Sequence, residues 1–292
     1  MVKVTFLGNE SPYLQVIKDQ SLLHLVVCEK VGWKAKKYFG SSYDFARRNR
    51  IQIMEPHLYV NNPIATDLII VSGYPKLIPS RIINRPKIGI VNIHQSLLPA
   101  YGGRHPLNWA IINGEKYTGI TIHHVNEKFD DGKIIFQERV NIGSEDTIMD
   151  VYYKTVEKGK KLLRKLLSTI IKDGINGSVQ NKRLGSYFPP RTPEDGKINW
   201  KESAVKIKNL VRALAEPYPG AYFYYKGRKI ILEDVSVVDN RSIDGDIGKP
   251  ILVNGKVLVM TGNGTLEILK TRNFNWTFGK FMKKNNRSGN YY

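Results

Sequence analysis

Four strongly apolar runs in the first hundred residues limit what this 292-residue chain can fold into. They occupy residues 2–7, 22–29, 65–73 and 88–94, and helical or loop segments separate them. Strands that are apolar along their whole length are buried on both faces, which is typical of a parallel sheet covered by helices. The pattern therefore predicts an α/β domain with a Rossmann-like, mostly parallel sheet.

The last third of the chain has a different pattern. A helix predicted over 201–214 is followed by short strand-like segments that Gly-containing turns separate: GAYFYY, KIILEDVSVV, ILVNGKVLVMT and TLEILK. Such segments predict a small β-barrel of the oligonucleotide/oligosaccharide-binding (OB) kind. Residues 173–196, rich in Gly and Pro, are the best candidate for a linker. We therefore predict one domain over 1–190 and an OB-like C-terminal domain over 191–292.

Composition excludes several classes of protein. A single cysteine, Cys28, excludes an internal disulfide and favours a reducing, cytoplasmic setting. No apolar run reaches the ~18–20 residues of a membrane helix, and the first ten residues lack the apolar stretch of a secretory signal. The first strand leads into LGNESPY, which lacks the G-x-G-x-x-G phosphate cradle, so the sheet does not predict a dinucleotide site.

The formal net charge of +19 raises the question of a polyanionic partner. Basic residues are densest in KGKKLLRKLL, residues 158–167, where leucines and lysines fall on opposite faces of a helix. A solvated cationic face explains this pattern best, and a polyanionic partner is the alternative. Net charge alone favours phosphate in general and no particular substrate. With the solvated face preferred, we predict no nucleic-acid partner.

Polar side chains end the fourth apolar run. Asn92 and His94 are two residues apart, so they share a face at the carboxyl end of the strand, where ligands bind in open α/β sheets. An amide donor beside an imidazole suits oxyanion binding and proton transfer. A carboxylate that orients the imidazole is available from Asp130 or Asp131, in the turn FDDG of a predicted hairpin.

Two further histidines are adjacent in the sequence and raise the question of a metal site. His123 and His124 are adjacent in a predicted strand and therefore face opposite sides, so they cannot both bind one metal ion. With one cysteine and no H-x-x-x-H spacing, we predict no metal site.

Four motifs between residues 92 and 137 carry a resemblance to a known family. They read N-I-H-x-S-L-L-P, Y-x-G-R, N-G-E-x-x-T-G-I-T-I-H and D-x-G-x-I-I-x-Q, in this order and with little gapping. Together they resemble the signature of folate-dependent formyltransferases, which move a formyl group from N10-formyltetrahydrofolate to an amine. The resemblance implies that residues 1–190 form a formyltransferase catalytic domain, and it suggests a homodimer.

The resemblance also assigns site residues. It places the catalytic Asn, His and Asp of the family on Asn92, His94 and Asp130, with Asp130 preferred to Asp131 because it lies two residues before the Gly. The folate pocket would be lined by Lys76, Leu77, Ile78, Ser96, Leu97, Leu98, Pro99, Asn126, Glu127, Lys128 and Phe129, with Arg104 at its edge. One departure is Gly102, which stands where the family commonly has Arg.

A mechanism follows from these assignments. A neutral amine attacks the formyl carbon, and Asn92 and a protonated His94 stabilise the negative charge that develops on the formyl oxygen. Asp130 would orient His94. The proton that the attacking nitrogen loses goes either to His94 or to a water molecule, and the sequence leaves both open.

Two local matches favour a nucleotide-linked amino sugar as the acceptor. G-R-H-P-L-N-W at 103–109 and R-T-P-E-D-G at 191–196 resemble motifs of the branch that formylates UDP- or dTDP-linked amino sugars for surface polysaccharides such as the O-antigen of lipopolysaccharide. Arg191 is accordingly a candidate for substrate binding. The alternative is methionyl-tRNA formyltransferase, which the net charge and the basic segment GWKAKKYFG favour. Neither the sugar nor the amine position, 3 or 4, can be predicted.

Overall fold

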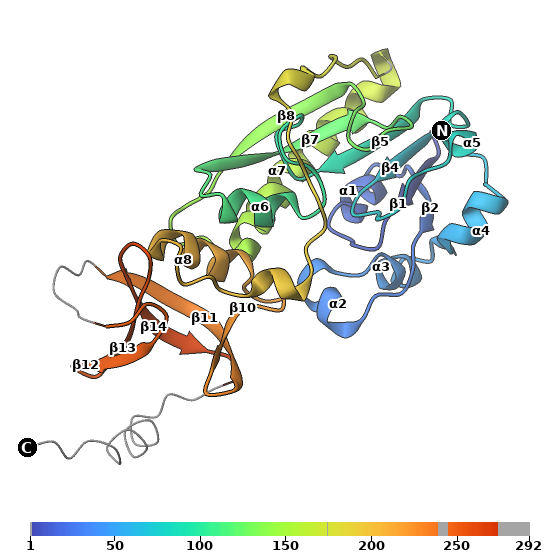
Figure 1. Ribbon diagram of the computed structural model, residues 1–292. Coiled ribbons are helices and arrows are strands. Elements are labelled where there is room, and N and C mark those ends of the chain that lie inside the picture. The colour runs from blue at the N-terminus through green and yellow to red at the C-terminus, as the bar shows by residue number, and fades with distance from the viewer. Residues whose placement is uncertain (1, 174, 239–244, 274–292) are drawn as a thin grey trace, which may run out of the picture. The chain divides into compact units, whose positions relative to one another are not determined.

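The computed structural model describes residues 2–173, 175–238 and 245–273 (Figure 1). The chain forms two compact units, one of residues 1–110 and 115–191, the other of residues 111–114 and 192–292. Each unit has its own sheet. In the part of the chain that the structure describes, no helix combines the length and the apolar character that crossing a membrane requires.

Seven strands form the sheet of the first unit, in the order β3-β2-β1-β4-β5-β7-β8. Their bounds are β1 Val4–Leu7, β2 Leu23–Val27, β3 Gln52–Met54, β4 Leu68–Val71, β5 Gly89–His94, β7 Tyr117–His124 and β8 Ile134–Asn141. The first five run parallel, and β7 and β8 continue the sheet antiparallel. This order confirms the predicted Rossmann-like, mostly parallel sheet, and buried β1 and β4 explain the unbroken apolar runs.

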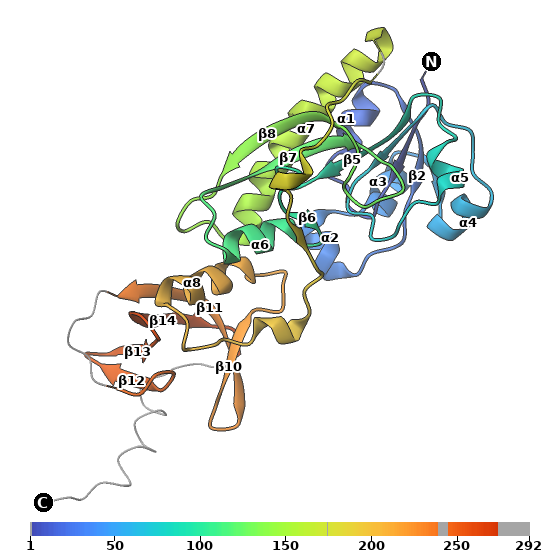
Figure 2. The same cartoon turned by 45° about the horizontal axis from the view of Figure 1, so that its top comes forward.

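Helices surround this sheet (Figures 1 and 2). They are α1 Leu14–Asp19, α2 Trp33–Phe39, α3 Ser42–Arg48, α4 Pro56–Asn61, α5 Ser80–Ile83, α6 Pro106–Ile112 and α7 Ile148–Asp173. The long helix α7 packs against β7, β8 and α1. It begins with a reciprocal cap, because the Thr147 amide donates to the Asp150 carboxylate at 2.8 Å and the Asp150 amide donates to the Thr147 hydroxyl at 3.4 Å.

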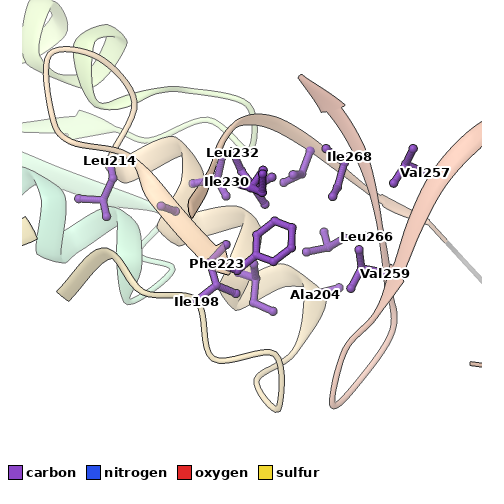
Figure 3. Close-up of a cluster of buried hydrophobic side chains, with 14 residues drawn as sticks. Ile198, Ala204, Leu214, Phe223, Ile230, Leu232, Val257, Val259, Leu266 and Ile268 are labelled. Atoms are coloured by element: carbon purple, nitrogen blue, oxygen red, sulfur yellow. The ribbon is translucent and has the colours of Figure 1, made fainter. Parts of the chain in front are cut away.

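The second unit is a five-stranded antiparallel sheet in the order β10-β11-β14-β13-β12, with one helix packed on it. The elements are α8 Ala204–Ala213, β10 Ala221–Tyr225, β11 Arg228–Val238, β12 Pro250–Val253, β13 Lys256–Met260 and β14 Thr265–Thr271. Phe223, Leu232 and Leu266 lie in its buried core beside Ala204 of α8 (Figure 3). Among the described strands β10 and β12 are not paired, so closure into an OB-like barrel stays a prediction.

The middle of the predicted linker is built into the first unit. β9, Tyr187–Phe188, pairs with β6, Gly102–Gly103, and Ser178 exchanges two backbone hydrogen bonds of 2.8 Å with Ile134. The expectation of a linker throughout 173–196 is therefore wrong for residues 178–188. Gly177, just before this stretch, permits a close backbone approach, because a Cβ atom there would lie 3.0 Å from the carbonyl oxygen of Ile134. Composition does not distinguish such a glycine from one in an extended connection.

A carboxyl group is buried just beyond β1. The hydroxyl of Tyr152 donates a hydrogen bond of 3.3 Å to Glu10. Burial, and next the charge of Glu10, raise the pKa of the nearby Tyr13. Burial raises the pKa of Glu10 from 4.5 to about 7, and the hydrogen bond from Tyr152 opposes the shift only in part. Ionised Glu10 is therefore unfavourable in the folded state.

The free energy of unfolding should fall as the pH rises from 4.5 to about 7, because the folded chain keeps a proton on Glu10 that the unfolded chain has released. Glu10→Gln should flatten this slope and stabilise the protein at about pH 8 by roughly 1–3 kcal/mol. Urea unfolding across this pH range measures the effect. Glu55→Gln is the control, since the Glu55 side chain is 64% exposed and should leave the slope unchanged. An undiminished slope in the Glu10 variant would contradict the assignment.

Candidate active site

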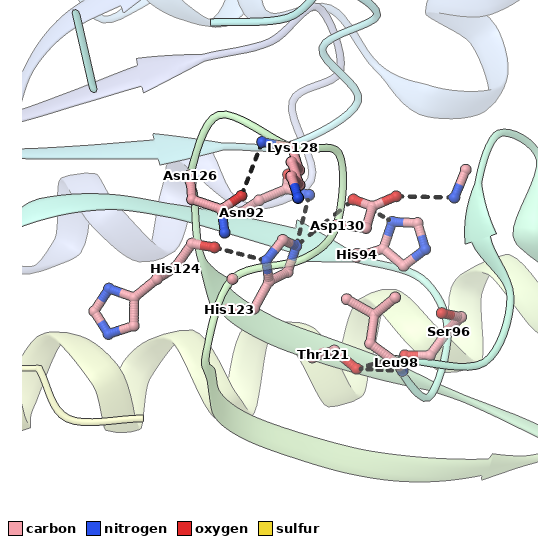
Figure 4. A network of polar contacts seen from close by, with 12 residues as sticks. Asn92, His94, Ser96, Leu98, Thr121, His123, His124, Asn126, Lys128 and Asp130 are labelled. Atoms are coloured by element: carbon pink, nitrogen blue, oxygen red, sulfur yellow. Dashed lines mark hydrogen bonds and ion pairs between the residues drawn. The ribbon is translucent and has the colours of Figure 1, made fainter. Parts of the chain in front are cut away.

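The three predicted catalytic side chains meet at the carboxyl end of β5 (Figure 4). Asn92 and His94 come from β5 itself, and Asp130 comes from the loop between β7 and β8. The Nδ1 atom of His94 lies 3.6 Å from Oδ1 of Asp130. Its Nε2 atom lies 3.0 Å from the carbonyl oxygen of Tyr101, to which it donates. Both ring nitrogens thus face acceptors, which fixes the orientation of the imidazole.

The backbone holds Asp130 in an uncommon conformation. Its φ is +53°, in the left-handed region, and its Oδ2 atom accepts a hydrogen bond of 2.9 Å from the amide of Gly103. The side-chain amide of Gln180 donates to the carbonyl oxygens of Asp130 and Gly132, both at 2.7 Å. A Cβ atom at Gly132 would lie 1.7 Å from the carbonyl oxygen of His124, so only glycine fits there.

His123 belongs to the same network, although it was not predicted to be a site residue and was named only to exclude a metal site shared with His124. Its Nε2 atom lies 3.1 Å from Nδ2 of Asn92 and 3.7 Å from Oδ1 of Asp130. Its Nδ1 atom lies 2.8 Å from the carbonyl oxygen of His124, whose own ring points the other way (Figure 4). Burial, and next the nearby His94, lower the pKa of His123. The His123 ring is therefore neutral.

Side chains of β7 and β8 hold the turn that follows β5 by hydrogen bonds to its carbonyl oxygens. The Thr121 hydroxyl donates to the carbonyl oxygen of Ser96 at 2.6 Å, and the side chain of Gln137 donates to the carbonyl oxygen of Leu98 at 2.9 Å. Ser96 and Leu98 are themselves buried, and the Ser96 hydroxyl donates to the carbonyl oxygen of Ala100. These two predicted pocket residues set the shape of the turn, and their side chains face the protein.

Two other predicted pocket segments carry exposed apolar side chains. Leu77, after β4, is 53% exposed, and Phe129, in the β7–β8 loop, is 49% exposed. Lys76 forms an ion pair of 3.5 Å with Glu29, and Ile78 packs against the core of the sheet. Exposed apolar residues beside the carboxyl ends of parallel strands are the kind of surface that a flat organic ligand would cover.

Other residues predicted to line the pocket lie in the β7–β8 loop and in the turn after β5. Asn126 closes a turn of the β7–β8 loop by accepting a hydrogen bond of 3.0 Å from the amide of Lys128. Glu127 and Lys128 are exposed in this loop. Leu97 fills the space beside Gly119, where a Cβ atom would lie 2.2 Å from its Cδ2.

Two segments that resemble the amino-sugar branch touch each other. The guanidinium of Arg191 lies over the ring of Trp109, 4.5 Å from its centroid, and the Arg191 amide donates to Nδ1 of His105 at 3.1 Å. The indole of Trp109 donates to the carbonyl oxygen of Pro189 at 3.1 Å. Arg104 is exposed next to this cluster in sequence. These contacts all lie within the first unit, and a guanidinium over an aromatic face is a favourable pair.

The site offers acid–base and hydrogen-bonding groups. Among the described residues, no group of three or more His, Cys, Asp or Glu side chains is arranged to hold a metal ion. An amide donor, an imidazole and an orienting carboxylate can stabilise an oxyanion and move a proton, which are the requirements of acyl-group transfer.

Comparison with known proteins agrees with this chemistry. Residues 28–167 match the formyl transferase family, and residues 191–275 match the formyl transferase C-terminal domain. The chain is 37% identical over 231 residues to the methionyl-tRNA formyltransferase of Alkaliphilus oremlandii, covering 76% of this chain and 74% of that relative. It is 31% identical over 283 residues to the methionyl-tRNA formyltransferase of Fusobacterium nucleatum, covering 91% of each. The chain therefore belongs to the formyl transferase family and is a formyl-transferring enzyme.

The fold is also that of a solved enzyme. An N-formyltransferase from Helicobacter canadensis, crystallised with folinic acid and dTDP-3-aminofucose, superposes with a TM-score of 0.75 at 20% identity, covering 93% of this chain and 100% of that one. At this level of identity the likeness establishes the fold. The predicted family and fold class are thus confirmed, and the acceptor is a separate question.

Proposed function

We propose that the chain transfers a formyl group from N10-formyltetrahydrofolate to the amino group of a dTDP- or UDP-linked 3- or 4-amino deoxysugar. Its product would serve the synthesis of a surface polysaccharide such as an O-antigen. The enzyme would act in the cytoplasm as a homodimer, without a nucleic-acid partner.

One observation carries the choice of acceptor. The two segments that resemble the amino-sugar branch, 103–109 and 191–196, are in contact, because the guanidinium of Arg191 lies over Trp109. Trp109 also donates a hydrogen bond to Pro189, just before the second segment. A planar guanidinium supported on an aromatic ring suits a diphosphate, because its donors are held in a fixed fork. The crystal structure of the Helicobacter enzyme with dTDP-3-aminofucose supports the same class of acceptor.

The mechanism assigns one task to each catalytic side chain. The substrate nitrogen forms a bond to the formyl carbon, and Asn92 donates a hydrogen bond to the formyl oxygen as negative charge develops there. The bond from the formyl carbon to N10 then breaks, and tetrahydrofolate leaves with a proton. His94 takes part in this proton transfer while Asp130 orients its ring. The separation of 3.6 Å is compatible with this role, because catalytic hydrogen bonds often tighten only with substrate bound.

The co-substrate fits the exposed apolar residues. Leu77 and Phe129 would contact the flat ring system of the folate, and the turn at Ser96–Pro99 would line the pocket beside them. Lys76 is exposed at the same end of the sheet, beside the acidic Glu29, where it could meet a carboxylate of the folate tail.

A second candidate function is the formylation of methionyl-tRNA. The two methionyl-tRNA formyltransferases compared above are 37% and 31% identical in sequence to this chain, whereas the solved sugar enzyme is 20% identical. The helix α2, with its lysines, also supports this alternative, because none of its residues is buried and Trp33 is 76% exposed. Exposed cationic and aromatic side chains together are a common nucleic-acid surface.

A formyl-transfer assay distinguishes the two acceptors. The chain would be incubated with N10-formyltetrahydrofolate and a panel of UDP-, dTDP- and GDP-linked 3- and 4-amino sugars, and in parallel with methionyl-tRNA. Turnover on a nucleotide sugar alone is the expected result. Turnover on the tRNA alone would overturn the proposal and make α2 a candidate binding surface. The His94→Ala variant serves as the inactive control, so that uncatalysed formylation is subtracted.

A further inference from the structure

We propose that His123 is a positioning residue of the transfer reaction: its Nε2 atom accepts a hydrogen bond from the Asn92 side chain and thereby fixes which way that amide faces. The inference rests on the role proposed for Asn92 as the donor to the formyl oxygen. The strand register, the hydrogen-bond partners of the ring and the surrounding charges support this role of His123.

The strand register places the two side chains together. Asn92 of β5 is directly opposite His123 of β7 in the antiparallel ladder. Directly opposed residues project to the same face of a sheet, so a contact between them is built into the backbone. Figure 4 shows the two side chains pointing toward one another, with Nδ2 of Asn92 3.1 Å from Nε2 of His123.

The hydrogen-bond partners determine the tautomer. The carbonyl oxygen of His124 can only accept, so Nδ1 of His123, 2.8 Å away, carries the hydrogen. In a neutral imidazole the other nitrogen then has a lone pair and accepts. Its partner must be a donor, which assigns the NH2 group of Asn92, rather than its oxygen, to the side that faces His123. The second hydrogen of that NH2 group remains for the formyl oxygen.

The surrounding charges keep the ring neutral. Burial and the neighbouring His94 lower the pKa of His123, and only Asp130 and the hydrogen bond to His124 act in the opposite direction. A protonated Nε2 would instead attract the Asp130 carboxylate, 3.7 Å away, and would repel the amide hydrogens of Asn92. A neutral His123 therefore also leaves Asp130 to interact with His94.

A matched pair of substitutions tests the role by kinetics. Glutamine and methionine have similar length, and both lose the hydrogen bond to His124, but only glutamine can present an acceptor to Asn92. His123→Met should lower kcat about 10- to 100-fold with little change in KM, which is less than the ~10²–10³ lost when an oxyanion donor is removed outright. His123→Gln should recover most of that loss. His124→Gln, at the neighbouring ring that points away, is the control and should have native kinetics.

The tautomer can be measured without any acceptor substrate. Nitrogen-15 NMR of histidine-labelled protein, with the His123 signals assigned from the His123→Gln variant, should show a neutral ring protonated at Nδ1 near neutral pH. This measurement remains informative if the panel assay finds no sugar acceptor, so a failure of the proposed function and a failure of this inference are distinguishable. A ring protonated at Nε2 or doubly protonated, or a glutamine variant as impaired as the methionine variant, would overturn the role of His123.

Discussion

Replacing His94 with alanine should lower kcat by at least about a thousandfold while the affinity for tetrahydrofolate stays close to that of the native chain. The expected loss is large because the imidazole faces the Asp130 carboxylate and is the group that we propose for the proton transfer. Folate binding should persist because the exposed apolar residues proposed to contact it, Leu77 and Phe129, lie on other loops.

Two measurements on the same preparations check this prediction. Single-turnover formyl transfer gives the rate of the chemical step, and fluorescence titration gives the dissociation constant of tetrahydrofolate. His57→Ala is the control, since His57 is exposed and lies on α4, outside the site network. Comparable losses of turnover and of folate affinity would show that His94 serves binding and that its assignment to the chemical step is wrong.

Replacing Asp130 with asparagine should lower kcat by about 10²–10⁴. An asparagine oxygen can still accept from the Gly103 amide, so the backbone of the loop is retained. Its NH2 group would then face Nδ1 of His94 in place of a carboxylate oxygen, and the attraction that orients the ring would be lost. Steady-state kinetics with the preferred acceptor measures the effect, and a thermal unfolding scan checks that the variant is folded.

The neighbouring Asp131 offers a matched control. Its carboxylate forms an ion pair of 2.7 Å with Lys182, a pair that is largely exposed on the lysine side and is therefore worth little. Asp131→Asn changes the same chemical group one residue away and should leave kcat within about twofold. Equal losses in the two variants would mean that the loop tolerates no change at this turn, and the specific role of Asp130 would be rejected.

Periodicity was sufficient to predict the first sheet because its strands are buried on both faces, and such strands must be apolar throughout. In the second unit the run ILVNGKVLVMT suggested one strand, whereas the structure has two, β12 and β13. Asn254 and Gly255 have φ of +46° and +84° and form the turn between them. The dipeptide is a strong hairpin signal, and apolar residues on either side obscured it.

The candidate site was predictable where one strand carries it. Strand alternation put Asn92 and His94 on one face, but only the family resemblance preferred Asp130 to Asp131. His123 and Gln180 were missed, because their roles depend on contacts across strand pairs and between segments distant in sequence. A histidine opposite Asn92 has no local signature, since the register of β5 with β7 is set by the whole sheet.

The segment from Ser178 to Phe188 limits how far the protein can be truncated from its C-terminal side. A protein truncated at the end of α7 would keep Asn92, His94 and Asp130, yet it would lack Gln180, whose amide holds the Asp130 loop by two carbonyl groups. It would also expose β6 by removing its partner strand. The smallest excised fragment with a formed catalytic loop should therefore extend to Arg191, and a truncation soon after α7 would disrupt that loop without removing a catalytic residue.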